Sequence, residues 1–149
     1  MRSLLGGRFG QDGDVAWVYR HLPIQNLHEN APALAHASEC IAEETNNENF
    51  WSFSDLYYDQ QGRVADLLAL ATQLDGVTEE FFTTCMNEQR HIEKIQNDMK
   101  EATLAGGNGT PFNVFIFKEP INDQMKTLVD DINAQVGSDA LTIISDNQL

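Results

Sequence analysis

Residues 106–117 read Gly-Gly-Asn-Gly-Thr-Pro-Phe-Asn-Val-Phe-Ile-Phe, and this stretch decides the fold. Its glycines, Asn108 and Pro111 are typical of a turn, whereas the short run of bulky residues from Phe112 to Phe117 predicts a strand. Working outward, Val15–Arg20 reads Val-Ala-Trp-Val-Tyr-Arg and lies between a glycine and a proline, so it predicts another strand. The sequence therefore predicts two strands that are widely separated along the chain.

The residues between these two strands carry apolar side chains at helical spacing. Thr78 is a predicted N-cap, because two glutamates follow it in the first turn of a helix. Two strands separated by a long helical block predict an α/β sheet interrupted by a helical insertion rather than regular βαβ units. The predicted helical segments are Leu34–Ile41, Phe50–Tyr57, Val64–Leu74, Phe81–Met86 and Ile92–Ala102, the last two in either one helix or two.

The C-terminal part repeats the alternation of strand and helix. Pro120 suits the beginning of a helix, and the apolar positions from Met125 to Val136 predict its buried face. Gly137 closes this helix, and Leu141–Ile144 is either a third strand or an ordered tail.

Composition narrows the classes of partner. Acidic residues outnumber basic ones 23 to 9, the net charge is -14, and the few basic residues are scattered, so neither nucleic acid nor an anionic membrane is an expected partner. No apolar run reaches the length of a membrane span. Residues 1–7 lead into polar residues instead of an apolar core, so a secretion signal is not expected, and the compartment stays open.

The sequence predicts neither a metal nor a cofactor. Glu88 and His91 have the Glu-x-x-His spacing of di-iron bundles, but no second copy occurs among the other histidines. The glycine-rich loop at Gly106–Thr110 lacks the lysine of a phosphate-binding loop and precedes a strand instead of a helix. No Gly-x-Ser-x-Gly motif marks a hydrolase nucleophile.

Cys40 and Cys85 are the two cysteines of the chain, and both lie among apolar helical residues. They are either packing thiols or a structural disulfide between neighbouring helices. Neither has a second cysteine at Cys-x-x-Cys spacing, so a reactive redox pair is not expected.

Three stretches together resemble the DsbA-like thioredoxin family. The first is Val15–Ala31, the second runs from Ala35 to Tyr57 and is continued by Phe82, Cys85 and Asp98, and the third is Gly106–Phe112. The resemblance implies a thioredoxin-like core at residues 1–25 and 107–149 with a helical insertion at residues 26–106. It also implies that Thr110 and Pro111 form a cis-proline loop that binds extended peptides through its backbone.

The chain departs from that family pattern at its start, because the family's first central strand and its Cys-x-x-Cys helix would precede Val15. Cys40 and Cys85 match positions of the family's helical insertion. The resemblance thus implies a truncated, redox-inactive protein that binds peptide or protein segments. The alternatives are a fragment of an active thiol-disulfide oxidoreductase and a structural homodimer. The missing central strand is expected to be replaced by residues 140–145 or by a strand of a second copy. The family works outside the cytoplasm.

Overall fold

The computed structural model describes residues 18–60, 66–115, 122–136 and 141–143. In these described ranges, five helices precede β1: α2 (Ala31–Glu44), α3 (Asn47–Asp59), α4 (Leu67–Ala71), α5 (Glu79–Glu88) and α6 (Ile92–Leu104). They are followed by β1 (Asn113–Phe115), α7 (Asp123–Val136) and β2 (Leu141–Ile143). Within the described residues, no helix has the length and apolarity needed to cross a membrane.

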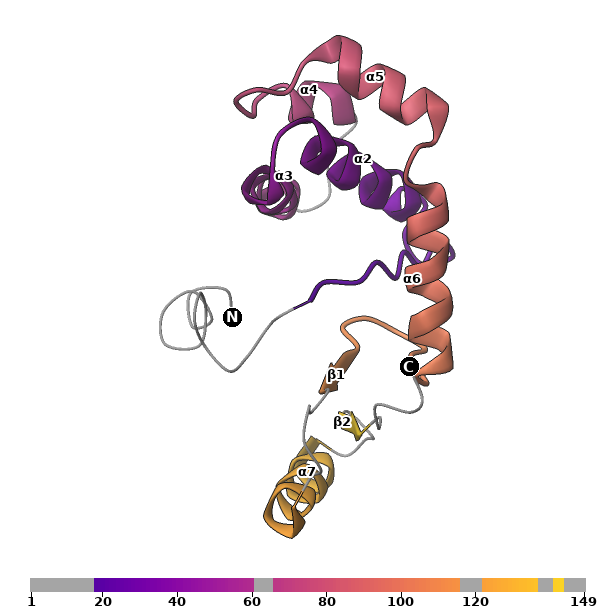
Figure 1. The fold of residues 1–149 in the computed structure, drawn as a ribbon, viewed down its shortest axis with the longest axis vertical. Helices are drawn as coiled ribbons and strands as arrows, with labels where there is room; N and C mark the ends of the chain where they lie inside the picture. Colours follow the sequence, from indigo (N-terminus) through magenta and orange to yellow (C-terminus); the bar gives the residue numbers. More distant parts are fainter. Residues whose placement is uncertain (1–17, 61–65, 116–121, 137–140, 144–149) are drawn as a thin grey trace.

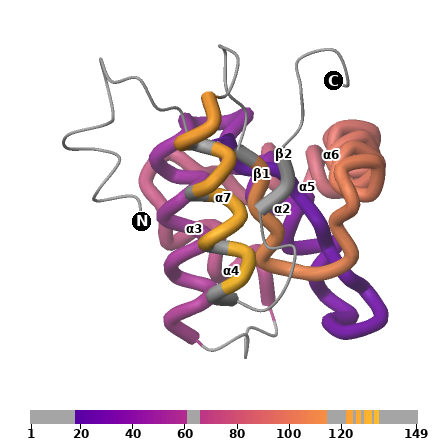
Figure 2. Tube along the Cα trace, turned by 90° about the horizontal axis from the view of Figure 1, so that it is seen from below, coloured from indigo at the N-terminus to yellow at the C-terminus, as the bar shows by residue number. Residues whose placement is uncertain are grey.

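Helix α2 is the centre of the helical block. It contacts α3, α4, α5 and α6, with α3 on one side of it and α6 on the other (Figures 1 and 2). Its buried face contributes Ala37, Cys40 and Ile41 to a core that is completed by side chains of the next three helices. Those side chains are Phe53 of α3, Leu70 and Ala71 of α4, and Phe82 and Cys85 of α5.

Short polar side chains fix where three of these helices begin. Asn46 accepts a hydrogen bond from the backbone N–H of Asn49, and Asp66 accepts from the first turn of α4. Thr78 accepts from the N–H of Phe81, which confirms the predicted N-cap of α5. The backbone N–H and hydroxyl of Thr78 also donate to Glu44 at the end of α2, so the start of α5 is tied to the end of α2.

β1 and β2 form a two-stranded parallel sheet, with Asn113, Val114 and Phe115 opposite Leu141, Thr142 and Ile143. Parallel neighbours require a long crossover, and α7 supplies it and contacts β2. Figure 1 shows this strand–helix–strand unit at the far end of α6 from α5. The structure thus pairs the C-terminal segment, one of the two predicted replacements for the missing strand, with β1.

Two predicted elements differ from the structure, and a third point that the sequence left open is decided. The strand predicted at Val15–Arg20 is wrong for its described part, because residues 18–20 form no strand. The helix predicted over Val64–Leu74 is described only as the short α4, with residues 61–65 outside the described part. α5 and α6 are separate, since Gln89 has a left-handed backbone with φ of 55°.

Two glycines shape the loop between α6 and β1. Gly106 has φ of 88° and ends α6, because most residues avoid that conformation. The N–H of Gly107 donates to the carbonyl of Ala102 at 2.8 Å, and a Cβ added at Gly107 would lie 2.9 Å from that oxygen and from the ring of Phe112. Gly107 therefore lets the chain turn tightly against α6 before Thr110.

We predict that Gly107→Ala lowers the free energy of unfolding by about 1–3 kcal/mol, because the added methyl group overlaps a backbone oxygen. Gly109→Ala is the matched control, since a Cβ there meets nothing within 4 Å. Urea unfolding of both variants provides the measurement, and the control should stay within about 0.5 kcal/mol of the wild type. Equal losses at the two positions would contradict the prediction.

Candidate functional site

The Thr110–Pro111 loop lies between α6 and β1 (Figure 1). Both residues are exposed, and the peptide bond that joins them is cis. Among the described residues, no hydrogen bond occupies the backbone of Thr110. Backbone groups that are exposed and unpaired can accept and donate hydrogen bonds to a ligand. The loop thus offers an accessible stretch of backbone directly before a strand.

The segment that precedes α2 is anchored by a buried carboxylate, Asp98 of α6. Asp98 is 1 % exposed and accepts from the Arg20 guanidinium at 2.9 Å and from the backbone N–H of His21 at 3.1 Å. The Lys94 ammonium lies 3.3 Å from it. Burying a charge is unfavourable unless it is paired and hydrogen-bonded, and here both conditions are met. These contacts hold residues 20 and 21 against α6.

Glu39 of α2 joins the same network from the other side. Its carboxylate lies 2.7 Å from Nε2 of His21, which is buried, and 2.8 Å from the Lys94 ammonium. Burial alone would raise the pKa of Glu39, but the hydrogen bonds from His21 and Lys94 outweigh it and lower the pKa to about 2. Glu39 is therefore ionised across the physiological range and binds the N-terminal segment to α2.

Cys40 and Cys85 form a disulfide, which decides between the two alternatives left by the sequence. Their Cα atoms are 5.9 Å apart, within the usual range for a disulfide, and both residues are 0 % exposed. The bond joins α2 to α5 across a sequence separation of 45 residues. The bond lies inside the helical core. The apolar neighbours of both cysteines in the sequence are consistent with this position.

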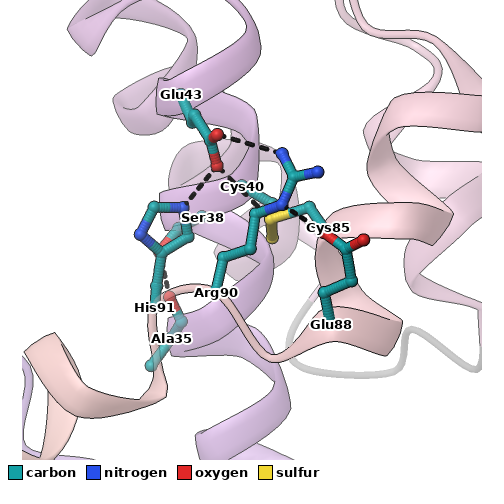
Figure 3. Close-up of a disulfide and its surroundings, with 8 residues drawn as sticks. All are labelled: Ala35, Ser38, Cys40, Glu43, Cys85, Glu88, Arg90 and His91. Carbon is teal, nitrogen blue, oxygen red and sulfur yellow. Dashed lines mark hydrogen bonds and ion pairs between the residues drawn. A yellow bond between two sulfur atoms is a disulfide. The ribbon is translucent and has the colours of Figure 1, made fainter.

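Charged side chains surround one side of the disulfide (Figure 3). Glu43 of α2 lies 3.0 Å from Nη1 of Arg90 and 2.9 Å from Nε2 of His91. A carboxylate oxygen of Glu43 also lies 3.7 Å from Sγ of Cys85. Because a disulfide sulfur carries no proton, this approach is a close contact rather than a hydrogen bond while the disulfide is intact.

His36 also lies beside the two sulfur atoms, and its ring centroid is 6.1 Å from that of His91. Its side chain is buried, and among the described residues its Nε2 has no hydrogen-bond partner. Burial lowers the pKa of His36, and the nearby His91 lowers it further. The imidazole of His36 is therefore neutral at physiological pH and has a ring nitrogen with a free lone pair.

The sequence predicted no cluster of ligand-type side chains here, yet the structure brings five together. The missed signal is the spacing of His36, Cys40 and Glu43, which places all three on one face of a helix. By contrast, Glu88 and His91 do not share a helical face, because α5 ends at Glu88 and Gln89 turns the chain. Glu88 instead pairs with Arg90.

We predict that the double variant Cys40→Ala/Cys85→Ala loses about 4 kcal/mol of unfolding free energy, the chain-entropy value for closing a loop of 45 residues. Urea unfolding in metal-free buffer measures it. The wild type under a thiol reductant is the control and should fall to a similar value. A loss below about 1 kcal/mol in both cases would show that the disulfide does not support the helical block.

A second prediction concerns pH. The folded pKa of Glu39, about 2, lies below its usual value of 4.5, so its contribution to stability is complete above pH 4.5 and is lost as pH falls towards 2. Between these values the wild type should lose more unfolding free energy than Glu39→Gln, measured by urea unfolding at each pH. Glu80→Gln, at an exposed position of α5, should follow the wild type. Parallel curves for wild type and Glu39→Gln would contradict the assignment.

Comparisons with known proteins show which family the chain belongs to. The chain is 33% identical over 100 residues to Na(+)/H(+) antiporter NhaA 1 of Salinispora arenicola, and 35% identical over 99 residues to Na(+)/H(+) antiporter NhaA 3 of Salinispora tropica. These alignments cover 66% and 65% of this chain but 15% of each antiporter. No solved structure matches significantly. A family model described as thioredoxin matches residues 9–131, most of the chain, and the protein therefore belongs to the thioredoxin family.

Proposed function

We propose that this chain is a recognition module of the thioredoxin family that binds extended polypeptide segments at the Thr110–Pro111 loop and does not exchange disulfides with its own cysteines. Within the family it is proposed to be of the DsbA-like type, with a core at residues 1–25 and 107–149 and a helical insertion at residues 26–106. The observation that carries the proposal is the exposed Thr110, which lies shortly before β1 and whose backbone has no hydrogen-bond partner among the described residues.

The position of the loop supports binding of an extended segment. A peptide that pairs with a sheet edge gains affinity from main-chain hydrogen bonds and needs a loop whose backbone is accessible at the end of a strand. Thr110 and Pro111 lead directly into β1, and Gly107 holds the loop against α6. A loop that is already positioned loses less conformational entropy when a ligand binds.

The two cysteines argue against disulfide exchange by these 149 residues. Exchange begins when a thiolate attacks a disulfide sulfur, so it requires an accessible, activated sulfur. Cys40 and Cys85 are bonded to each other and are 0 % exposed. They are also the full cysteine content of the sequence. We therefore expect the chain to be inactive in reducing a model disulfide substrate.

The competing proposal is a homodimer that forms through the same sheet. Within the described residues, β1 pairs with β2 alone, so its other edge is open to a strand of a peptide or of a second copy. Light scattering over a range of protein concentrations separates these occupants. A dimer that dissociates as peptide is added would support a shared edge.

The antiporter relatives suggest a second candidate function. Because the chain matches 15% of each, the segment it resembles is a small part of a transport protein. We infer as the alternative that the chain acts as a module attached to a larger protein, either a transporter or an active oxidoreductase. The coding DNA upstream of Met1 and the intact mass in the source cell test this. An in-frame extension that encodes membrane spans would identify a transporter, and one that encodes a Cys-x-x-Cys motif would identify an active oxidoreductase.

We predict that the chain binds unfolded, carboxymethylated polypeptide and that both Thr110→Arg and Thr110→Glu weaken binding at least tenfold. Either side chain would cover the loop backbone, so the loss should not depend on the sign of the charge. Fluorescence anisotropy of the labelled polypeptide measures the affinity, and a tenfold loss corresponds to about 1.4 kcal/mol.

The matched controls are Asn108→Arg and Asn108→Glu, at an exposed position of the same loop. They should change the affinity less than twofold, and circular dichroism should show that all four variants fold. The proposal fails if the wild type shows no saturable binding, or if the two positions respond equally.

A further inference from the structure

We propose that reduction of the Cys40–Cys85 disulfide converts this part of the helical block into a Zn²⁺ site. The ligands are His36, Cys40 and Glu43 of α2 and Cys85 of α5. The inference is independent of peptide binding at the Thr110 loop.

The ligand atoms already lie close together. One ring nitrogen of His36 and the sulfur atoms of Cys40 and Cys85 all lie within 4.8 Å of one another. The same holds for a carboxylate oxygen of Glu43, the sulfur of Cys85 and a ring nitrogen of His91. Cys85 belongs to both groups, so the two sets meet at its sulfur.

The helical geometry places these ligands beside one another. His36, Cys40 and Glu43 follow each other at i, i+4 and i+7 along α2, so their side chains point to the same side of the helix. Cys85 approaches from α5, which packs against α2. Two cysteines, one imidazole and one carboxylate make the four-ligand set that Zn²⁺ takes in tetrahedral sites.

His36 supplies an observation that the disulfide alone does not explain. It is 3 % exposed, and its Nε2 has no partner among the described residues, although a buried polar atom is normally paired. Its neutral imidazole lies against the two sulfur atoms. A metal ion bound to His36 and to the thiolates would give this buried imidazole a partner.

The side chains around the site suit a metal centre. His91 lies 2.9 Å from Glu43 and can orient that carboxylate, as partners of metal ligands commonly do. Arg90 lies 3.0 Å from the other oxygen of Glu43. Two thiolates and one carboxylate around Zn²⁺ leave one negative charge, which the guanidinium of Arg90 offsets. Glu43 is exposed, so an ion can enter from this side. Figure 3 shows the Glu43 carboxylate beside Arg90 and His91.

The conversion needs an external dithiol, which reaches the buried sulfurs when α5 opens locally from α2. The dithiol transfers two electrons and two protons to the disulfide, becomes a disulfide itself, and leaves Cys40 and Cys85 as thiols. Zn²⁺ then displaces the two thiol protons and binds both sulfurs. With Zn–S bonds of about 2.3 Å, the sulfurs need a separation of about 3.8 Å in a tetrahedral site. Side-chain rotation can supply it, since the Cα atoms are 5.9 Å apart. Thiolate ligands favour Zn²⁺ over Mg²⁺ or Ca²⁺.

The test titrates Zn²⁺ into the wild-type chain in its oxidised form and after reduction by a phosphine, with calorimetry in two buffers of different ionisation enthalpy. The reduced chain should bind one Zn²⁺ and release protons, and the oxidised chain should bind at least 100-fold more weakly. Co²⁺ in place of Zn²⁺ should give the absorption of a tetrahedral thiolate complex in the reduced chain alone. Equal binding by the two forms, or no binding by the reduced form, would overturn the proposal.

Two variants test the ligand assignment in the reduced chain. His36→Asn and Glu43→Gln should each weaken Zn²⁺ binding at least tenfold, whereas the exposed His28→Asn and Glu48→Gln should not. Binding by both ligand variants at the wild-type affinity would overturn the assignment. Where reduction itself lowers the helical circular dichroism, Zn²⁺ should restore it. A reduced chain that stays unfolded with Zn²⁺ present also counts against the site.

Discussion

The carboxylate of Asp98 is the interaction on which the arrangement of the described chain depends. It is buried within α6, and it is neutralised by a residue that lies 78 positions earlier, Arg20, and by Lys94 one turn away. A buried charge that loses its partner is strongly unfavourable, so the N-terminal segment cannot leave α6 without a large cost in free energy. Glu39 extends the same constraint to α2 through His21. The network therefore fixes the segment before α2, the central helix and α6 relative to one another.

The sequence predicts the helical block well, and the reason is physical. Apolar spacing identifies α2, α3, α5 and α6, and Thr78 marks the start of α5, because these signals act within one or two turns. The strand predicted at Val15–Arg20 shows the limit. Val18 and Tyr19 have the composition of a strand, but Arg20 and His21 are held by Asp98, a contact that no local pattern reveals. Strand propensity describes a fit to a pleated, half-buried surface, and tertiary contacts override it here.

The two candidate sites also differ in how far the sequence predicts them. The Thr110–Pro111 loop is found from turn residues that are adjacent in sequence, so the sequence identifies it. In the cluster around the disulfide, His91 and Arg90 lie beside Glu43 because Gln89 turns the chain after α5. A left-handed backbone at a residue other than glycine is uncommon, so the sequence does not predict this turn. The spacing of Glu88 and His91 alone instead predicts that they share one helical face. The helix face of His36, Cys40 and Glu43 is visible in the sequence. The bond from Cys40 to Cys85 is one of two alternatives that the sequence leaves open, and the packing of α2 against α5 decides between them.

Helix α2 holds four other parts of the chain through four closely spaced residues. Glu39 binds the N-terminal segment, Cys40 is bonded to α5, Glu43 holds the turn after α5, and Glu44 binds Thr78. An inserted or deleted residue within this helix would rotate everything beyond it by about 100°. All contacts on one side of the change would then be out of register with their partners. Length variation among homologous chains should therefore be found in the loops, while α2 keeps a fixed number of residues between His36 and Glu44.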